Sequence, residues 1–103
     1  MIHYNVFFSI KPDVPESTCL GAAKEFLEEL RLKEYILRGT LLKNSSQKPK
    51  TSLPEYHALF QFKNDEIFNS TLTEIRAKGL EKGPHSILMK SVSEFRVEIF
   101  REI

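Results

Sequence analysis

The chain has 103 residues and a formal net charge of +1, with 41% hydrophobic and 28% charged residues. This length suits one domain over residues 1–103, and the near-zero charge provides no basic surface for a nucleic-acid backbone. No apolar stretch reaches the roughly 20 residues of a membrane helix. The single cysteine excludes an internal disulfide and fits a reducing compartment, so we expect a cytoplasmic protein.

The first predicted element is a strand over residues 2–10, IHYNVFFSI, which is dense in aromatic and β-branched residues. Because successive side chains of a strand point to opposite faces, its residues separate into two sets. The even-numbered residues make one face that is apolar throughout. The other face is mixed and consists of His3, Asn5, Phe7 and Ser9.

A helix that runs to about residue 32 follows this strand. Asp13, three residues before Glu16, has the spacing of a capping box at the start of the helix. Apolar residues then recur every three or four positions, which predicts one buried stripe along the helix. This stripe is formed by Cys19, Leu20, Ala23, Phe26, Leu27 and Leu30.

Two further strands flank a polar, proline-containing loop over residues 44–54. The third strand, residues 55–62, directs Tyr56 to an apolar face and His57 to a mixed face. The second strand covers residues 34–43, and its mixed face is formed by Ile36, Arg38, Thr40 and Leu42.

The remainder of the chain predicts a second helix, a short helical turn and a last strand. Asn64 or Asp65 caps the second helix, and its inner stripe is formed by Phe68, Leu72 and Ile75. The last strand, SEFRVEIFREI, places Phe95, Val97 and Ile99 on one face. Its other face carries Arg96, Glu98 and Phe100.

This order of elements predicts an α+β ferredoxin-like fold, in which a four-stranded antiparallel sheet has both helices on one face. The first and third strands are expected in the centre, parallel to each other. The uncovered face then combines Phe7, Leu59 and Phe100 with ionisable side chains. It is too apolar for water and too polar for an ordinary core, so we expect a homodimer through this sheet face.

The same topology predicts that His3, His57 and Glu98 lie together at one end of the sheet. Imidazoles with a carboxylate can bind a metal or transfer a proton, but no short-spaced ligand motif accompanies them. We therefore expect no metal. We interpret the three residues as hydrogen-bonded groups that fix the register of the two sheets, with ligand binding as the alternative.

Other polar residues have two interpretations each. His85 follows a Gly-Pro pair and either caps a helical turn or lines a cleft between helices and sheet. Arg38 and Arg96 either bind a carboxylate or pair with Glu98. Tyr56 packs on the apolar face, from which its hydroxyl can reach the cleft.

Two segments, LPEYHALFQF and PHSILMKSVSEFRVEIFREI, resemble a family of short uncharacterised bacterial proteins in the dimeric α/β-barrel superfamily. That family has a Pro-Glu-aromatic-His strand, a later histidine, and a Phe-Arg strand ending in aromatic-Arg-acid. The matching residues are Pro54, Glu55, Tyr56, His57, His85, Phe95, Arg96, Phe100, Arg101 and Glu102. The resemblance implies the fold and a homodimer, but no particular reaction.

The wider superfamily includes cofactor-free monooxygenases, heme-degrading monooxygenases and lactone isomerases. The heme-degrading members use an Asn on the first strand, a Trp and a His. This chain has Asn5 and His85 but no Trp, so we expect no heme and no other cofactor. Two functions remain: a dimer that binds a small apolar or aromatic molecule in the cleft, and a cofactor-free monooxygenase-like or isomerase-like enzyme acting on an aromatic substrate.

Overall fold

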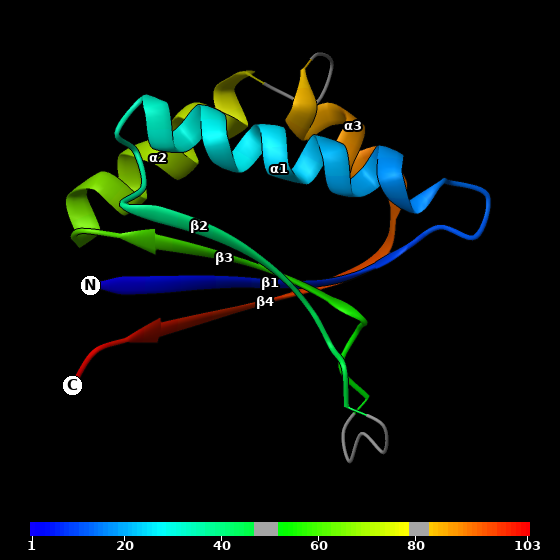
Figure 1. The fold of residues 1–103 in the computed structure, drawn as a ribbon. Coiled ribbons are helices and arrows are strands. Elements are labelled where there is room, and N and C mark those ends of the chain that lie inside the picture. The colour runs from blue at the N-terminus through cyan, green and yellow to red at the C-terminus, as the bar shows by residue number, and fades with distance from the viewer. Residues whose placement is uncertain (47–51, 79–82) are drawn as a thin grey trace.

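The computed structural model describes residues 1–46, 52–78 and 83–103, so the middle of the predicted loop, residues 47–51, lies outside the described part. The strands of this part form one antiparallel sheet in the order β2-β3-β1-β4, and its helices lie on one face of the sheet (Figure 1). The predicted ferredoxin-like fold is confirmed. In order, the elements are β1 (Ile2–Ile10), α1 (Glu16–Leu32), β2 (Arg38–Lys43), β3 (Tyr56–Phe62), α2 (Asp65–Lys78), α3 (Pro84–Ser91) and β4 (Val92–Arg101).

The direction of β3 differs from the prediction. β1 and β3 are central neighbours, as expected, but they run antiparallel, with His3 opposite Gln61 and Phe7 opposite His57. The reason is topological. The crossover through α1 brings β2 back in the direction of β1, and the hairpin then reverses β3, which lies between them. His3 and His57 are consequently at different ends of the sheet.

β2 is shorter than predicted, because the chain turns sharply after α1. The backbone N–H of Tyr35 donates to the carbonyl of Leu30 at 3.0 Å, and Glu34 has a φ of 60°, in the left-handed region. This turn places Ile36 in the core, where it is 3% exposed. The assignment of Ile36 to the mixed sheet face was therefore wrong.

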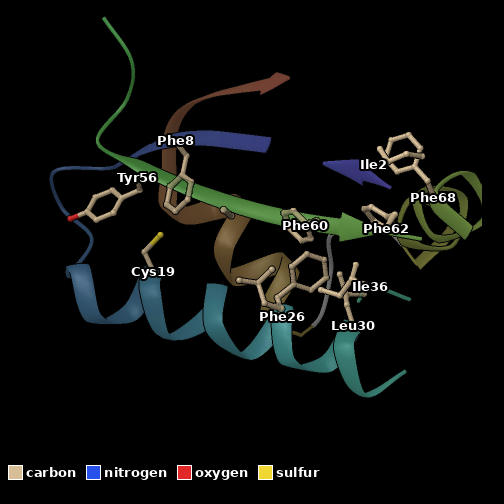
Figure 2. Packing of buried hydrophobic residues seen from close by; sticks show 12 residues of the cluster. Ile2, Phe8, Cys19, Phe26, Leu30, Ile36, Tyr56, Phe60, Phe62 and Phe68 are labelled. Atoms are coloured by element: carbon tan, nitrogen blue, oxygen red, sulfur yellow. The ribbon is translucent and has the colours of Figure 1, made fainter. Parts of the chain in front are cut away.

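The core lies between the sheet and the helices, and it follows the predicted alternation (Figure 2). In β3, Tyr56, Ala58, Phe60 and Phe62 are buried, whereas the three residues between them are only partly buried. Phe26 of α1 packs edge-on against Phe60, with ring centroids 6.0 Å apart. Each fully buried large side chain of this kind stabilises the fold by about 1.5–3 kcal/mol.

The two helix starts differ in how well they were predicted. Asn64 caps α2, because its Oδ1 accepts a hydrogen bond from the N–H of Ile67 at 2.9 Å. Asp13 does not cap α1. The chain makes a turn in which the N–H of Val14 donates to the carbonyl of Lys11, and the N-cap position is taken by Pro15 without a side-chain hydrogen bond.

Candidate functional site

The predicted site residues lie on two opposite sides of the sheet. His85 and Tyr56 belong to the helix-covered side. The open side carries the other six, which are His3, Asn5, Arg38, His57, Arg96 and Glu98. These sides are separated by the backbone of the sheet, so they cannot form one site within a single chain.

A cavity of about 180 Å³ lies between the helices and the sheet. Its wall includes Tyr4, Val6 and Phe8 from β1, and Phe26 and Leu30 from α1. Engineered apolar cavities of about 150 Å³ stay dry and bind benzene, so this volume suits one small apolar molecule. The remaining lining residues are Ala58, Phe60, Phe62, Leu72, Ile75, His85, Leu88, Met89, Val92, Phe95 and Val97.

His85 is the ionisable imidazole of this cavity. Its ring packs on Phe26, with centroids 4.8 Å apart and planes at 40°. Burial lowers the pKa of His85, because desolvation disfavours the imidazolium. No side-chain cap hydrogen bond forms at the start of α3, and no described residue is a hydrogen-bond partner for this ring. Of the two interpretations, the structure favours the cleft position over the cap.

Tyr56 is buried, but it does not line the cavity. Its ring stacks on Phe8, with centroids 5.6 Å apart, and Figure 2 shows its hydroxyl directed away from the centre of the core. Burial, together with a hydrogen bond to Glu16, raises the pKa of Tyr56. Cys19 points toward the same part of the sheet, and burial raises the pKa of its thiol, which disfavours a nucleophilic thiolate.

On the open face, Asn5 orients the imidazole of His57. The Asn5 amide nitrogen donates to the carbonyl oxygens of His3 at 3.0 Å and Glu98 at 3.1 Å, which uses both of its hydrogens. The Asn5 Oδ1 must therefore accept from the His57 Nε2, 2.8 Å away, so this nitrogen carries the ring hydrogen. Phe7 stacks on the same ring at 4.3 Å between centroids.

Burial also lowers the pKa of His57. In the neutral ring, Nδ1 is a hydrogen-bond acceptor, and no described residue donates to it. This acceptor on the open face is a position at which a second molecule can donate.

The predicted grouping of His3, His57 and Glu98 is wrong. His3 lies 3.3 Å from Glu102, through Nε2 and Oε1, and 3.5 Å from the amide nitrogen of Gln61, through Nδ1. Only the backbone carbonyl of Glu98 contacts the residues around His57, because it accepts a hydrogen bond from the Asn5 amide. In the part of the chain that the structure describes, no three His, Cys, Asp or Glu residues are placed to hold a metal ion.

Arg38, Arg96 and Glu98 form no ion pairs among the described residues, contrary to the predicted pairing with Glu98. Arg38 lies on β2 and Glu98 on β4, which are opposite edges of the sheet. Arg96 shares the strand and face of Glu98, yet the two side chains do not pair. Among the described residues, the open face thus has unpaired positive charges on β2 and β4 and an unpaired negative charge on β4.

The helical part of the cavity wall was not predicted from the sequence. Leu88 and Met89 line the cavity from α3, which the sequence indicated only as a short helical turn. Their side chains are ordinary core residues by type, so composition does not separate them from packing. The one local signal is the Gly-Pro pair before His85, which marks a helix start.

We expect the midpoint of thermal unfolding to fall as the pH is lowered between about 7.5 and 5.5. The folded-state pKa values of His57 and His85 lie below the ordinary value of 6.5. The unfolded chain therefore binds more protons as the pH falls, and the stabilisation present above 6.5 is progressively lost. Calorimetry of the double variant His57→Phe, His85→Phe should give a flatter profile. An unchanged slope would contradict the expectation.

The four-stranded antiparallel sheet, the helices on one face and the cavity beneath them define a ferredoxin-like protein. The chain belongs to DUF6614, a family of unknown function, whose model matches residues 1–103. No curated protein gives a significant match to the chain. Over residues 1–46, 52–78 and 83–103, no helix has the length and apolar character needed to cross a membrane.

Several solved structures share the fold at low sequence identity. At3g17210 from Arabidopsis thaliana has a TM-score of 0.77 at 13% identity, over 100% of this chain and 96% of its own. A dimeric ferredoxin-like protein of unknown function from Jannaschia sp. CCS1 has a TM-score of 0.70 at 12% identity, over 98% of both chains. A Dabb-family protein from Mesorhizobium loti has a TM-score of 0.58 at 13% identity, over 99% and 96%.

Proposed function

We propose that the chain is one domain that forms a homodimer through the open face of its sheet and binds a small apolar or aromatic molecule in its cavity. The observation that carries the binding role is the cavity of about 180 Å³, apolar except for Tyr4 and His85. Apolar walls with few polar groups are typical of small-molecule sites. We place this function in the cytoplasm, where the lone thiol of Cys19 would stay reduced.

The composition of the open face supports the dimer. Leu42 and Phe100 are 44% and 58% exposed in the single chain, and Phe7 on the same face is partly buried. A second copy of the face would cover these side chains. A twofold axis that sets β2 over β4 of the partner would also bring Arg38 toward Glu98 of the partner subunit. The Jannaschia protein with the same fold is dimeric, which supports the same arrangement here.

Toluene is expected to bind to the wild-type protein and to raise its unfolding midpoint. A ligand present at ten times its Kd stabilises the folded state by about 1.4 kcal/mol. Ala58→Leu should abolish this effect, because Ala58 is buried in the cavity wall and the larger side chain would occupy the ligand volume. Differential scanning calorimetry with and without toluene measures both results.

Ala77→Leu is the matched control for this experiment. Ala77 is exposed on α2 and does not line the cavity, so the same substitution there should leave the toluene effect intact. Equal toluene effects in the wild type and Ala58→Leu would contradict cavity binding, as would no effect in either protein.

Catalysis is the second candidate, and it is favoured by the imidazole of His85, which has no hydrogen-bond partner among the described residues. A neutral imidazole at the wall of an apolar cavity can accept a proton from a bound aromatic substrate. This is the role that a cofactor-free monooxygenase-like or isomerase-like enzyme would require. Tyr4 supplies the second polar group of the cavity, with its hydroxyl as a hydrogen-bond donor.

A further inference from the structure

We propose that the cavity takes a linear amphiphile with one uncharged hydroxyl, a medium-chain aliphatic alcohol, whose hydroxyl binds His85 and whose tail leaves the cavity along β4. This inference rests on the proposed function and names the ligand class of the same site. Its two parts, the polar end and the tail, come from different observations.

A smaller depression of about 90 Å³ next to the cavity indicates where the polar end of the ligand would bind. The two share His85, Phe26, Leu30 and Ile75 in their walls. His85 thus lies where the apolar cavity meets an opening that charged side chains also line. The other residues of that opening include Glu29, Lys33, Tyr35 and Glu74.

The charged groups of the opening are engaged with one another. The Lys33 Nζ lies 3.0 Å from the Glu29 Oε1, and the Tyr35 hydroxyl is hydrogen-bonded to Glu74. A charged head group would have to displace one of these partners. A hydroxyl needs only the neutral imidazole of His85, which has an acceptor nitrogen and no partner among the described residues. An uncharged head group therefore fits this opening best.

The path of the tail is inferred from β4, an edge strand that contributes to the cavity wall. Phe95 and Val97 line the cavity, yet they are 52% and 39% exposed. Ile99, the next residue on the same face of the strand, is 42% exposed and lies outside the cavity wall. These three residues make an apolar row from the cavity to the surface. An alkyl chain is narrow and has no hydrogen-bonding group, so it matches such a row.

Calorimetric titration with 1-hexanol, 1-heptanol, 1-octanol and 1-nonanol tests the tail. In the wild type, Kd should fall about fourfold for each added methylene, the factor expected for burying that group. In Ile99→Thr, the last steps of the series should shrink to less than about twofold, while toluene binding stays unchanged. Leu37→Thr, an exposed apolar position beside the opposite edge of the sheet, should keep every step.

The variant His85→Phe tests the polar end. It should weaken each alcohol by about threefold to tenfold, the worth of one hydrogen bond. Nonanoate, which has the same number of carbon atoms and a charged head, should bind more weakly than 1-nonanol by more than the roughly fourfold expected for its one-carbon-shorter tail.

The outcomes separate this inference from the proposed function. Two results would overturn the placement of the tail along β4 and leave the proposed function standing, provided that toluene binds. In the first, the Kd of the alcohols does not depend on chain length. In the second, Ile99→Thr shows the same chain-length dependence as the wild type. Unchanged alcohol binding in His85→Phe, or nonanoate binding as tightly as 1-nonanol, overturns the polar end. If neither toluene nor any alcohol binds, both proposals are overturned.

Discussion

Replacing Phe7 with Asp is expected to convert the proposed dimer into a monomer at micromolar concentration. The new carboxylate would lie between two packed sheets, and an uncompensated buried charge costs at least about 3 kcal/mol. Both subunits of a twofold dimer carry the change, so a total of about 6 kcal/mol would raise Kd by about four orders of magnitude. Sedimentation equilibrium measures this change directly.

Two companion variants make the result specific to the sheet face. Leu42 shares this face and is 44% exposed in the single chain, so Leu42→Asp should also give a folded monomer. Phe7→Leu keeps an apolar side chain and should remain dimeric. A wild-type monomer, or a dimer that persists in both Asp variants, would rule out this interface.

Gly39→Ala is expected to destabilise the fold by about 1–3 kcal/mol, the range for inserting a methyl group into a filled core. A Cβ at this position would lie 2.8 Å from the Leu27 Cδ2, 2.9 Å from the Leu27 Cβ and 3.1 Å from the Ile36 Cδ1. The Leu27 Cβ is fixed to the backbone of α1, so relief requires the helix to move away from β2. Urea denaturation gives the free energy of unfolding.

Gly21→Ala is the matched control, because it adds the same methyl group to an exposed position of α1. Apart from the backbone of α1 itself, no atom of the described residues lies within 4 Å of the added Cβ. Alanine is a better helix former than glycine by about 1 kcal/mol, so this variant should be more stable than the wild type. If both variants shift the free energy of unfolding in the same direction, the close approach at Gly39 is not what sets the distance between α1 and β2.

Most of the fold could be predicted, because the strands alternate cleanly. A residue such as Phe60 has to be buried and its neighbour Leu59 has to face away, and this local rule holds whatever the strand order. The composition of the open face, with Phe7 stacked on His57, also follows from alternation alone. The side of the sheet on which each site residue lies was therefore accessible from the sequence.

Contacts between residues far apart in the sequence were predicted less well than the alternation, because these contacts depend on strand direction and on turns. Because β3 was predicted to run parallel to β1, His57 was expected beside His3. In the structure it lies opposite Phe7, near the other end of the strand. Ile36 was expected on the open face, but the turn that contains the left-handed Glu34 places it in the core on the helix-covered side. The cavity depended on α3, whose packing position no periodicity specifies.

The sheet order has a consequence for how the chain folds during synthesis. β1 pairs with β4 along its whole length, and the Asn5 side chain alone bridges 93 positions of the sequence to Glu98. Contacts of such high sequence separation slow folding, because a long segment must be ordered before they form. On the ribosome, one edge of β1 must wait unpaired until residues 92–101 emerge. Exposed edges of this kind promote aggregation, so the unpaired edge of β1 is the part of the nascent chain most exposed to intermolecular strand pairing.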